Sequence, residues 1–477
     1  MTVTVRKLKD TVKNGKDEKR TMKLGILPLY APLYERIDPG SAKRAAAFAG
    51  TLARKLSCEE LCAEAADVAL TVADVRRALR AMEASGADAV GVLFLAYHPS
   101  MQSAPALAET KLPVILLDTT PYLDFGPMAS PEQIMPCHGI HGVQDLCCVL
   151  ARMGKPYLVE AGYWDSEDYP GRVVRAVRSA VIAKAFAGAR VGLIGRPFED
   201  MGDFELPFDE IRARSGVQTV PLSPATCRRA VESVTDGEAD TEATRLRASY
   251  AVEIEDSAVL TAARTTVAIR KLVREFDLSA FSFNFLDFCE DTGLPTIPFV
   301  AACELMREGV GYAGEGDVLT AALVGALLRV YPETSFAEMF CPDFLGDRVF
   351  LSHMGELNAR VARRAALIDK PVPYVPPVGH APSVGAVYKT GSAVWMNISP
   401  GKRENRAILA SCHMDCPERD AFAGAVRGWL DPRMPVTDFL EQYSRLAGTH
   451  HSALVYHADP RVLADAATLC GMPVDRI

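Results

Sequence analysis

The sequence predicts an α/β protein with two parallel-sheet units followed by a C-terminal unit rich in antiparallel β-structure. Three observations support this prediction. Short apolar runs alternate with helix-like stretches over residues 23–185, and the same alternation returns over 186–344. From residue 345 onward proline and glycine become frequent, and the apolar runs become short and alternating. Alternating strands and helices indicate parallel sheets covered by helices, whereas short alternating runs between turn residues indicate antiparallel strands.

The first unit is expected over residues 23–185, after a polar and basic tail at 1–22 that we expect to be flexible. "KLGILPLY" has the pattern of a buried strand, and Gly86 separates a helical pattern from the apolar run "AVGVLFL". Short apolar runs bounded by glycine or proline are typical of strands in a parallel sheet. The pattern predicts a helix over 41–56, strands over 89–95 and 111–118, and a long helix over 141–153.

The second unit is expected over 186–344 and the third over 345–477. "GARVGLIG" begins the second unit as a strand and a glycine turn, and "LSAFSFNFLDF" and "PTIPFVAACELMREG" repeat strand and helix. The apolar helix "VLTAALVGALLRV" ends before Pro332, because proline cannot continue a helix. In the third unit "PVPYVPPVGHAPSVGAVYKTGSAVWMNIS" combines turn residues with short alternating runs, which is typical of antiparallel strands.

Composition indicates a globular protein and argues against two classes of partner. The 477 residues are 49% hydrophobic and 23% charged, with a formal net charge of −8. Nucleic-acid-binding domains usually carry a basic patch, so we expect no nucleic acid partner. No run approaches the ~18 apolar residues of a membrane span, so we expect no membrane association. Twelve scattered cysteines, with no apolar leader before them, predict reduced thiols and a cytoplasmic location.

A carboxylate between two glycines is the first candidate site residue. In "GYAGEGDVLTAALVG", Glu315 precedes an apolar helix whose expected N-cap is Asp317. The partial positive charge at a helix N-terminus favours an ionised carboxylate. Gly314 and Gly316 permit the tight turns that would present this carboxylate to a ligand. A surface acid near a helix start explains the same pattern, since acids are common there.

Glu338 has a competing structural explanation. In "SFAE", Ser335 and Glu338 have the spacing of a capping box, in which a serine N-cap and a glutamate three residues later satisfy the free amides of a helix start. The local pattern alone therefore favours a helix beginning at Ser335.

Histidines at the ends of other elements suggest a shared site for the two glutamates. "RVFLSH" delivers His353 at the end of a strand, and "GTHHS" places His450 and His451 at a turn before another strand. Neighbouring residues of an extended chain point to opposite sides, so only one of this pair is expected to face a site. Each histidine alone is explained as a core or surface residue. Together, two glutamates and two histidines form a ligand set that suits Mn²⁺, Co²⁺ or Zn²⁺.

Three other motifs have simpler explanations. "CHMDC" holds two thiols, but a structural zinc site needs a second close ligand pair, so we expect buried or partly exposed cysteines there. "GLIGRP" after a strand lacks the complete G-x-G-x-x-G of a dinucleotide site, and "GYAGEG" lacks the Lys-Ser/Thr of a phosphate-binding loop.

Several stretches resemble signature segments of the L-arabinose isomerase family. They are "GVGYAGEGDVLTAALVGAL", "TSFAEMF", "FLSHMGELN" and "GTHHS", and they occur in the family's order. The resemblance covers most of the chain after residue 23 and is weakest at 205–250 and 360–440. It implies two Rossmann-like parallel-sheet domains followed by a C-terminal antiparallel β-rich domain. It also implies a homotrimer or homohexamer with sites between subunits.

The resemblance further implies an aldose–ketose isomerase that acts on a sugar through an enediolate. The two glutamates would be the catalytic residues, and a divalent metal, with Mn²⁺ as first choice, would be bound by Glu315, Glu338, His353 and His451. His141, in "CHGIHGVQDL", matches a histidine expected from a neighbouring subunit. The residues assigned to substrate binding are His141, His450, Met339 and Phe340.

The chain departs from the family after the second glutamate. The family commonly has an acid and a tyrosine there, whereas this chain has Met339 and Phe340. Loss of polar partners for sugar hydroxyls usually changes specificity, so L-arabinose, L-fucose, D-galactose and other aldoses stay open as substrates. Two other functions also stay open. One is a sugar epimerase or aldolase-like lyase on the same metal site, and the other is a sugar-binding protein without catalysis.

Overall fold

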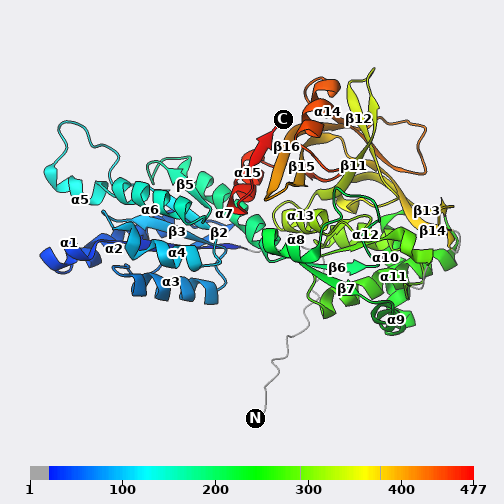
Figure 1. Cartoon of the computed structure of the whole chain (residues 1–477), viewed down its shortest axis with the longest axis horizontal. Coiled ribbons are helices and arrows are strands. Elements are labelled where there is room, and N and C mark those ends of the chain that lie inside the picture. The colour runs from blue at the N-terminus through cyan, green and yellow to red at the C-terminus, as the bar shows by residue number, and fades with distance from the viewer. Residues whose placement is uncertain (1–20, 290–291, 376–377) are drawn as a thin grey trace, which may run out of the picture.

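A computed structural model describes residues 21–289, 292–375 and 378–477 and contains three β-sheets. The molecule is elongated, with the first sheet at one end and the other two sheets at the opposite end (Figure 1). Two sheets are parallel and helix-covered, and the third is mostly antiparallel, which confirms the predicted fold class. Residues 1–20 of the expected tail lie outside the described residues, and the first strand already begins at Met22.

The N-terminal sheet is parallel, with the strand order β2-β1-β3-β4-β5. In this doubly wound order ligands bind at the carboxyl ends of the strands where the order reverses, here between β1 and β3. Its strands are β1 (Met22–Leu29), β2 (Leu61–Ala65), β3 (Ala89–Phe94), β4 (Val114–Asp118) and β5 (Tyr157–Ala161). Its helices are α1 (Pro32–Ile37), α2 (Ser41–Leu56), α3 (Val72–Ala84), α4 (Ala104–Glu109), α5 (Ile134–Cys137), α6 (Ile140–Arg152) and α7 (Tyr169–Ala187), with 3₁₀ turns at Ser100–Gln102 and Pro131–Gln133.

The central sheet repeats this order with one strand fewer, as β7-β6-β9-β10, and reverses between β6 and β9. Its strands are β6 (Arg190–Ile194), β7 (Gln218–Leu222), β9 (Ala280–Phe283) and β10 (Gly311–Ala313). Its helices are α8 (Phe208–Ser215), α9 (Pro224–Glu232), α10 (Asp236–Ser249), α11 (Asp256–Glu275), α12 (Phe299–Arg307) and α13 (Val318–Leu328), with a 3₁₀ turn at Phe285–Cys289.

Helix α13 joins the central sheet to the third sheet. All of its residues are buried, because it packs on β9 and β10 with one side and on β11 and β18 with another. A helix that is apolar all round is stable only in such a position. Neither α13 nor any other helix of the described residues has the length and apolar character needed to cross a membrane.

The third sheet has ten strands in the order β19-β16-β15-β18-β11-β12-β17-β14-β13-β8. They are β8 (Ala251–Val252), β11 (Thr334–Asp343), β12 (Arg348–Ser352), β13 (Ala362–Val372), β14 (Gly379–Tyr388), β15 (Gly391–Pro400), β16 (Asn405–Asp415), β17 (Val426–Asp431), β18 (His451–Tyr456) and β19 (Val474–Arg476). A 3₁₀ turn at Ala359–Val361 and helices α14 (Val436–Arg445) and α15 (Pro460–Leu469) complete this part. Cys412 and Cys416 of "CHMDC" are buried, as expected.

The sheets do not follow the expected domain ranges strictly. Strand β11 belongs to the third sheet but begins at Thr334, before the expected boundary at 344. Near the C-terminus α15 returns to pack on α7, and Ser179 Oγ donates a hydrogen bond of 2.9 Å to the carbonyl of Val462. The domain boundaries therefore stay predictions.

The helix expected to start at Ser335 is absent, so the capping-box explanation of Glu338 is wrong. Residues Thr334–Asp343 form β11, which pairs with β12 on one side and β18 on the other. Ser335 is buried, and its Oγ accepts a hydrogen bond of 3.0 Å from the amide of Asn358. Strand β11 pairs with β18 over residues 334–338 and with β12 over residues 338–343, and these backbone hydrogen bonds outweigh a local capping pattern.

Candidate metal centre

Strand pairing makes Glu338 a neighbour of two of the expected histidines. Glu338 on β11 pairs with Ser352 of β12 and with His451 of β18. Directly paired residues lie side by side on the same face of a sheet, and His353 follows Ser352 immediately. The register therefore places Glu338 beside His451, while His353 lies just beyond the end of β12, with its Nε2 3.7 Å from Glu338 Oε2.

Glu315 reaches the same place from the central sheet, at the carboxyl end of β10. Its φ is +64°, a left-handed conformation that is uncommon for residues other than glycine. Gly316 follows with a φ of +87°, and a Cβ added there would lie 2.5 Å from Pro197 Cα. The carbonyl of Glu315 accepts a hydrogen bond of 3.0 Å from the amide of Phe198. Strained residues held in this way are concentrated at functional sites.

The four side chains converge on one point. Glu315 Oε2 lies 3.6 Å from His451 Nε2, and His353 Nε2 lies 3.7 Å from Glu338 Oε2 and 4.0 Å from Glu315 Oε1. Two ligand atoms bonded to one ion at about 2.1 Å lie roughly 3 to 4 Å apart. These distances fall in that range, and the atoms with metal-ligand spacing form two groups that share His451.

Unpartnered buried atoms support the same assignment. Glu315 Oε2, His353 Nε2 and His451 Nε2 are buried and lack a hydrogen-bond partner within the described part of the chain, which is costly unless a ligand satisfies them. The opposite ring nitrogens are held by carboxylates, His353 Nδ1 by Glu356 at 2.8 Å and His451 Nδ1 by Asp317 at 3.1 Å. Carboxylates in this position orient metal-binding histidines. The residues present therefore fit a divalent metal ion.

Asp317 and Glu356 are site residues that the sequence did not identify as such. Asp317 caps α13 as expected, since its Oδ1 accepts a 2.9 Å hydrogen bond from the amide of Thr320, while its other oxygen holds His451. Glu356 is fully buried and accepts a 2.7 Å hydrogen bond from the hydroxyl of Tyr312. For Asp317 the capping pattern concealed the second contact. For Glu356 the only signal was its place three residues after His353.

Both adjacent histidines face the site, so the expectation that only one would do so is wrong. His450 lies in a bend and β18 begins at His451, so the pair is not part of one extended strand. Nε2 of each ring lies 3.6 Å from Glu315 Oε2. Together with Glu315 these rings form a second group of atoms with metal-ligand spacing.

The segment between β6 and α8 also reaches the site, which the sequence did not reveal. Asp203 Oδ2 lies 2.6 Å from His450 Nδ1. The ring of Phe204 stacks on His451, with centroids 5.1 Å apart and planes 9° apart. From the sequence, only "GLIGRP" at the start of this segment stands out, as an incomplete dinucleotide motif. Its place after a strand at the reversal of the sheet is the signal that could have identified it.

Burial and nearby charges shift the pKa values of the two glutamates in opposite directions. Burial tends to raise the pKa of Glu315, but the nearby imidazole of His450 and the charges of His451 and His353 outweigh it and lower the pKa. Burial raises the pKa of Glu338, and the same histidines offset this only in part. Burial opposes the charged form of His450, yet the hydrogen bond to Asp203 and the nearby carboxylate of Glu315 raise its pKa to about 10.

Of the residues assigned to substrate binding, only His450 lies among these ligands. Met339 packs against the core beside the large sheet, on the strand face opposite to Glu338. Phe340 follows at an irregularity in the pairing of β11 with β12 and is 46% exposed. Neither position places the residue among the metal ligands, so the substrate-binding roles of Met339 and Phe340 stay predictions.

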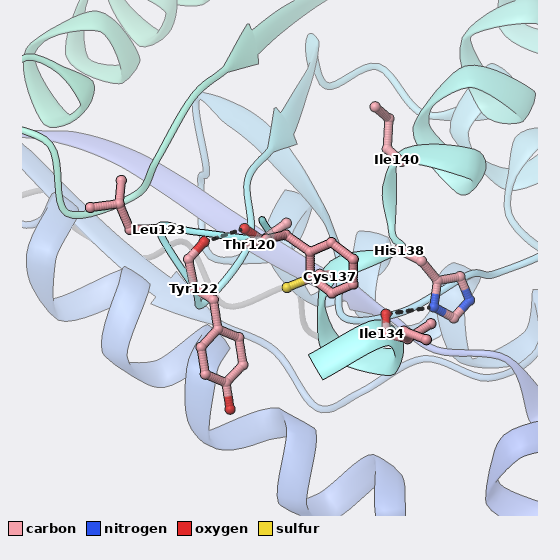
Figure 2. Close-up of a pocket in the computed structure, with 8 residues that line it drawn as sticks. Thr120, Tyr122, Leu123, Ile134, Cys137, His138 and Ile140 are labelled. Atoms are coloured by element: carbon pink, nitrogen blue, oxygen red, sulfur yellow. Dashed lines mark hydrogen bonds between the residues drawn. The ribbon is translucent and has the colours of Figure 1, made fainter. Parts of the chain in front are cut away.

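His141 lies on α6, in the N-terminal part of the molecule and away from the metal ligands (Figure 1). It is exposed, and its ring centroid is 5.7 Å from that of His138. His138 lines an open cavity, together with Thr120, Tyr122, Leu123, Phe125, Ile134, Cys137 and Ile140 (Figure 2).

In sequence, the chain is similar to L-arabinose isomerases. Residues 211–331 match the family model of the L-arabinose isomerase central domain. The chain is 25% identical to the L-arabinose isomerase of Herpetosiphon aurantiacus, over 70% of this chain and 68% of that protein. It is 24% identical to that of Lactiplantibacillus plantarum over 70% and 72%, and 31% identical to that of Leuconostoc mesenteroides over 44% of each chain. A periplasmic binding protein of an arabinose ABC transporter from Shewanella sp. ANA-3 aligns at 12% identity over 65% of this chain and 84% of that one, but its TM-score of 0.16 supports no inference.

Proposed function

Since the chain belongs to an L-arabinose isomerase-like family, we propose that it interconverts an aldose and a ketose at the site formed by Glu315, Glu338, His353 and His451. The observation that carries this proposal is the convergence of these side chains from two sheets. Three of their buried atoms point at one another without a hydrogen-bond partner in the described residues.

A divalent metal, with Mn²⁺ as first choice, is part of the proposal and would be held by these four residues. Bound there, it would polarise the sugar carbonyl and stabilise negative charge on the sugar oxygens. Glu356 and Asp317 would keep Nε2 of His353 and His451 directed inward, because each fixes the opposite ring nitrogen.

The two glutamates would carry out the proton transfers. An aldose and its ketose differ by the movement of one proton between C2 and C1 and one between the two oxygens, through an enediolate of the sugar. Glu315 and Glu338 lie 4.0 Å and 3.7 Å from the same His353 Nε2, so both carboxylates reach one small ligand. The lowered pKa of Glu315 keeps this carboxylate ionised, and the raised pKa of Glu338 brings it closer to the operating pH, where a carboxyl group exchanges protons most readily.

An epimerase or aldolase-like lyase is the second candidate, since both can use the same carboxylates. The observation that favours it is the irregular pairing at Met339, next to Glu338, where the family's acid and tyrosine are replaced. Fewer polar side chains beside the catalytic carboxylates would change which sugar hydroxyls are bound.

The proposal includes a homotrimer or homohexamer, in which the N-terminal part of one subunit covers the metal centre of another. Apolar residues near the cavity are exposed, Leu123 by 76%, Phe125 by 55% and Met128 by 95%, as is typical of contact surfaces (Figure 2). Helices α5 and α6 lie in the N-terminal part of the molecule, apart from the sheets that carry the metal ligands (Figure 1), so His141 would meet a metal centre only in another subunit. Light scattering on Leu123→Asp should show a smaller assembly than the wild type.

Product analysis tests the proposed function. Purified protein with Mn²⁺ would be incubated in D₂O with L-arabinose, L-fucose and D-galactose, and the products followed by NMR. A ketose of unchanged chain length supports the isomerase, an epimer or shorter fragments support the second candidate, and bound metal with neither product nor C2 deuterium exchange contradicts both. The expected cytoplasmic location belongs to this proposal and rests on the sequence alone.

A further inference from the structure

We infer that Asp203 is a positioning residue that holds the imidazole of His450 against Glu315. Asp203 lies between β6 and α8, and His450 precedes β18, 247 residues later. The inference deepens the proposed function, and its kinetic part rests on that function. It gives a role to the segment between β6 and α8, which supplies none of the four proposed ligands.

Two bonds from one residue converge on a single oxygen of Asp203. Its Oδ2 accepts a hydrogen bond of 3.1 Å from the backbone amide of His450 and lies 2.6 Å from Nδ1 of the same residue. The amide bond sets the position of the backbone, and the ring bond sets the rotation of the side chain. Together they direct Nε2 of His450 to within 3.6 Å of Glu315 Oε2.

Two aromatic rings also lie close to the imidazole of His450. The ring centroid of His451 is 4.2 Å away and that of Phe204 is 5.5 Å away. Both rings are tilted relative to the imidazole, by 46° and 44°, so they limit its movement but do not select its rotation. The carboxylate of Asp203 is therefore the group that decides which nitrogen faces Glu315.

His450 differs from the two histidines of the proposed ligand set in its exposure. The side chains of His353 and His451 are 2% and 0% exposed, whereas that of His450 is 31% exposed. Glu315 therefore lies between buried imidazoles on one side and the partly solvent-exposed imidazole of His450 on the other. A ligand that enters from solvent would meet His450 there, and a fixed Nε2 would offer a hydrogen bond to a polar group of that ligand.

The same segment is also anchored on its other side, so Asp203 is not a loose surface acid. The amide of Phe198 donates to the carbonyl of Glu315, and Phe204 stacks on His451. The segment thus contacts Glu315, His450 and His451 at once. Loss of the Asp203 carboxylate would release His450 while these other contacts persist.

The first test measures the accessibility of His450 and needs no catalysis. Metal-free protein would be treated with diethyl pyrocarbonate, and modification of each histidine followed by peptide mass spectrometry. Asp203→Asn should raise the modification rate of His450 severalfold relative to the exposed His380 and His457, whose side chains are 60% and 70% exposed. The control Glu199→Gln removes an exposed carboxylate of the same segment, which pairs with Arg196, and should leave the rate unchanged. Equal rates in the wild type and Asp203→Asn would overturn the inference.

The second test asks whether Asp203 acts through His450. Asp203→Asn should lower kcat/KM by about 10- to 100-fold, with Mn²⁺ affinity measured by electron paramagnetic resonance unchanged. In a His450→Gln background the same substitution should change kcat/KM by less than about twofold, because groups that act as a unit are not additive. If the double variant lost kcat/KM by the product of the two single-variant losses, the inference would be overturned.

Two further points separate the outcomes. If the wild type converts no aldose, the proposed function fails, while the modification rates still decide whether Asp203 positions His450. If Asp203→Asn does not fold, Asp203→Ser removes the charge with a smaller side chain and is measured in the same way. Circular dichroism and urea unfolding would establish that each variant compared is native.

Discussion

A methyl group added at Gly314 would press on His353. The Cβ of an alanine there would lie 2.7 Å from Cε1 and 3.1 Å from Nε2 of that ring. Ordinary contacts of a Cβ begin near 3.4 Å, so the ring must retreat by about 0.7 Å. The backbone of Gly314 is not left-handed, so this contact, and not backbone strain, is what the Gly314→Ala substitution introduces.

The ring of His353 has little freedom to retreat. It is 3% exposed, its Nδ1 is 2.8 Å from Glu356, and its face meets the edge of Phe336 at a centroid distance of 4.8 Å. The displacement must therefore move Nε2 relative to Glu338. Overpacking of a buried site typically costs about 1–3 kcal/mol of unfolding free energy. Disturbing the orientation of a metal ligand typically costs about 10- to 100-fold in metal affinity.

Manganese titration and urea unfolding measure both effects. Free Mn²⁺ would be followed by electron paramagnetic resonance during titration of Gly314→Ala and of the wild type. Gly424→Ala is the matched control, because a Cβ at that position meets no atom within 4 Å and its backbone is not left-handed. If Gly314→Ala binds Mn²⁺ and unfolds as the wild type does, the assignment of His353 as a tightly held ligand is refuted.

Three further predictions concern catalysis, metal and pH. Glu315→Gln and Glu338→Gln should each lower kcat by at least about 100-fold with native circular dichroism, and turnover by the double variant would contradict their roles. Removal of metal with EDTA should abolish turnover and lower the unfolding midpoint, and Mn²⁺ at 100 times its Kd should restore about 2.7 kcal/mol; unchanged stability would argue against a bound cation. Burial raises the pKa of Glu160 above 4.5, and Arg461 and Arg172 offset this only in part, so the stability that its neutral form contributes is complete below pH 4.5 and is lost as pH rises through the folded-state pKa. Glu160→Gln should therefore be at least as stable as the wild type at pH 8 and lose any advantage at pH 4, and lower stability than the wild type at pH 8 in urea unfolding would contradict the sign.

Local patterns predicted much of the secondary structure because its causes are local. The helix expected over 41–56 is α2, and the apolar run after Asp317 forms α13 with that aspartate as its cap. The same reasoning failed at Ser335, where the letters of a capping box lie inside β11. A strand paired along its length, first with β18 and then with β12, gains more than a single cap provides, and its partners are distant in sequence.

Residue types alone were enough to predict a cation-binding candidate site. Carboxylates and imidazoles at the ends of elements indicate a cation, and glycines beside Glu315 indicate a special turn. The turn itself was not readable, since Glu315 adopts the left-handed conformation itself. Nor was Asp203, whose contact with His450 spans most of the central and C-terminal sequence.

By itself, the sequence determined which segments become helices and strands and which side chains can bind a metal, because hydrophobic period and ligand chemistry are properties of short stretches. Only the tertiary structure decided that Glu338, His353 and His451 meet, and that Asp203 and Glu356 hold the rings. The pairing of β11 between β12 and β18 and the burial of α13 against two sheets bring these atoms together. Such contacts depend on packing between distant segments, which no short stretch of sequence contains.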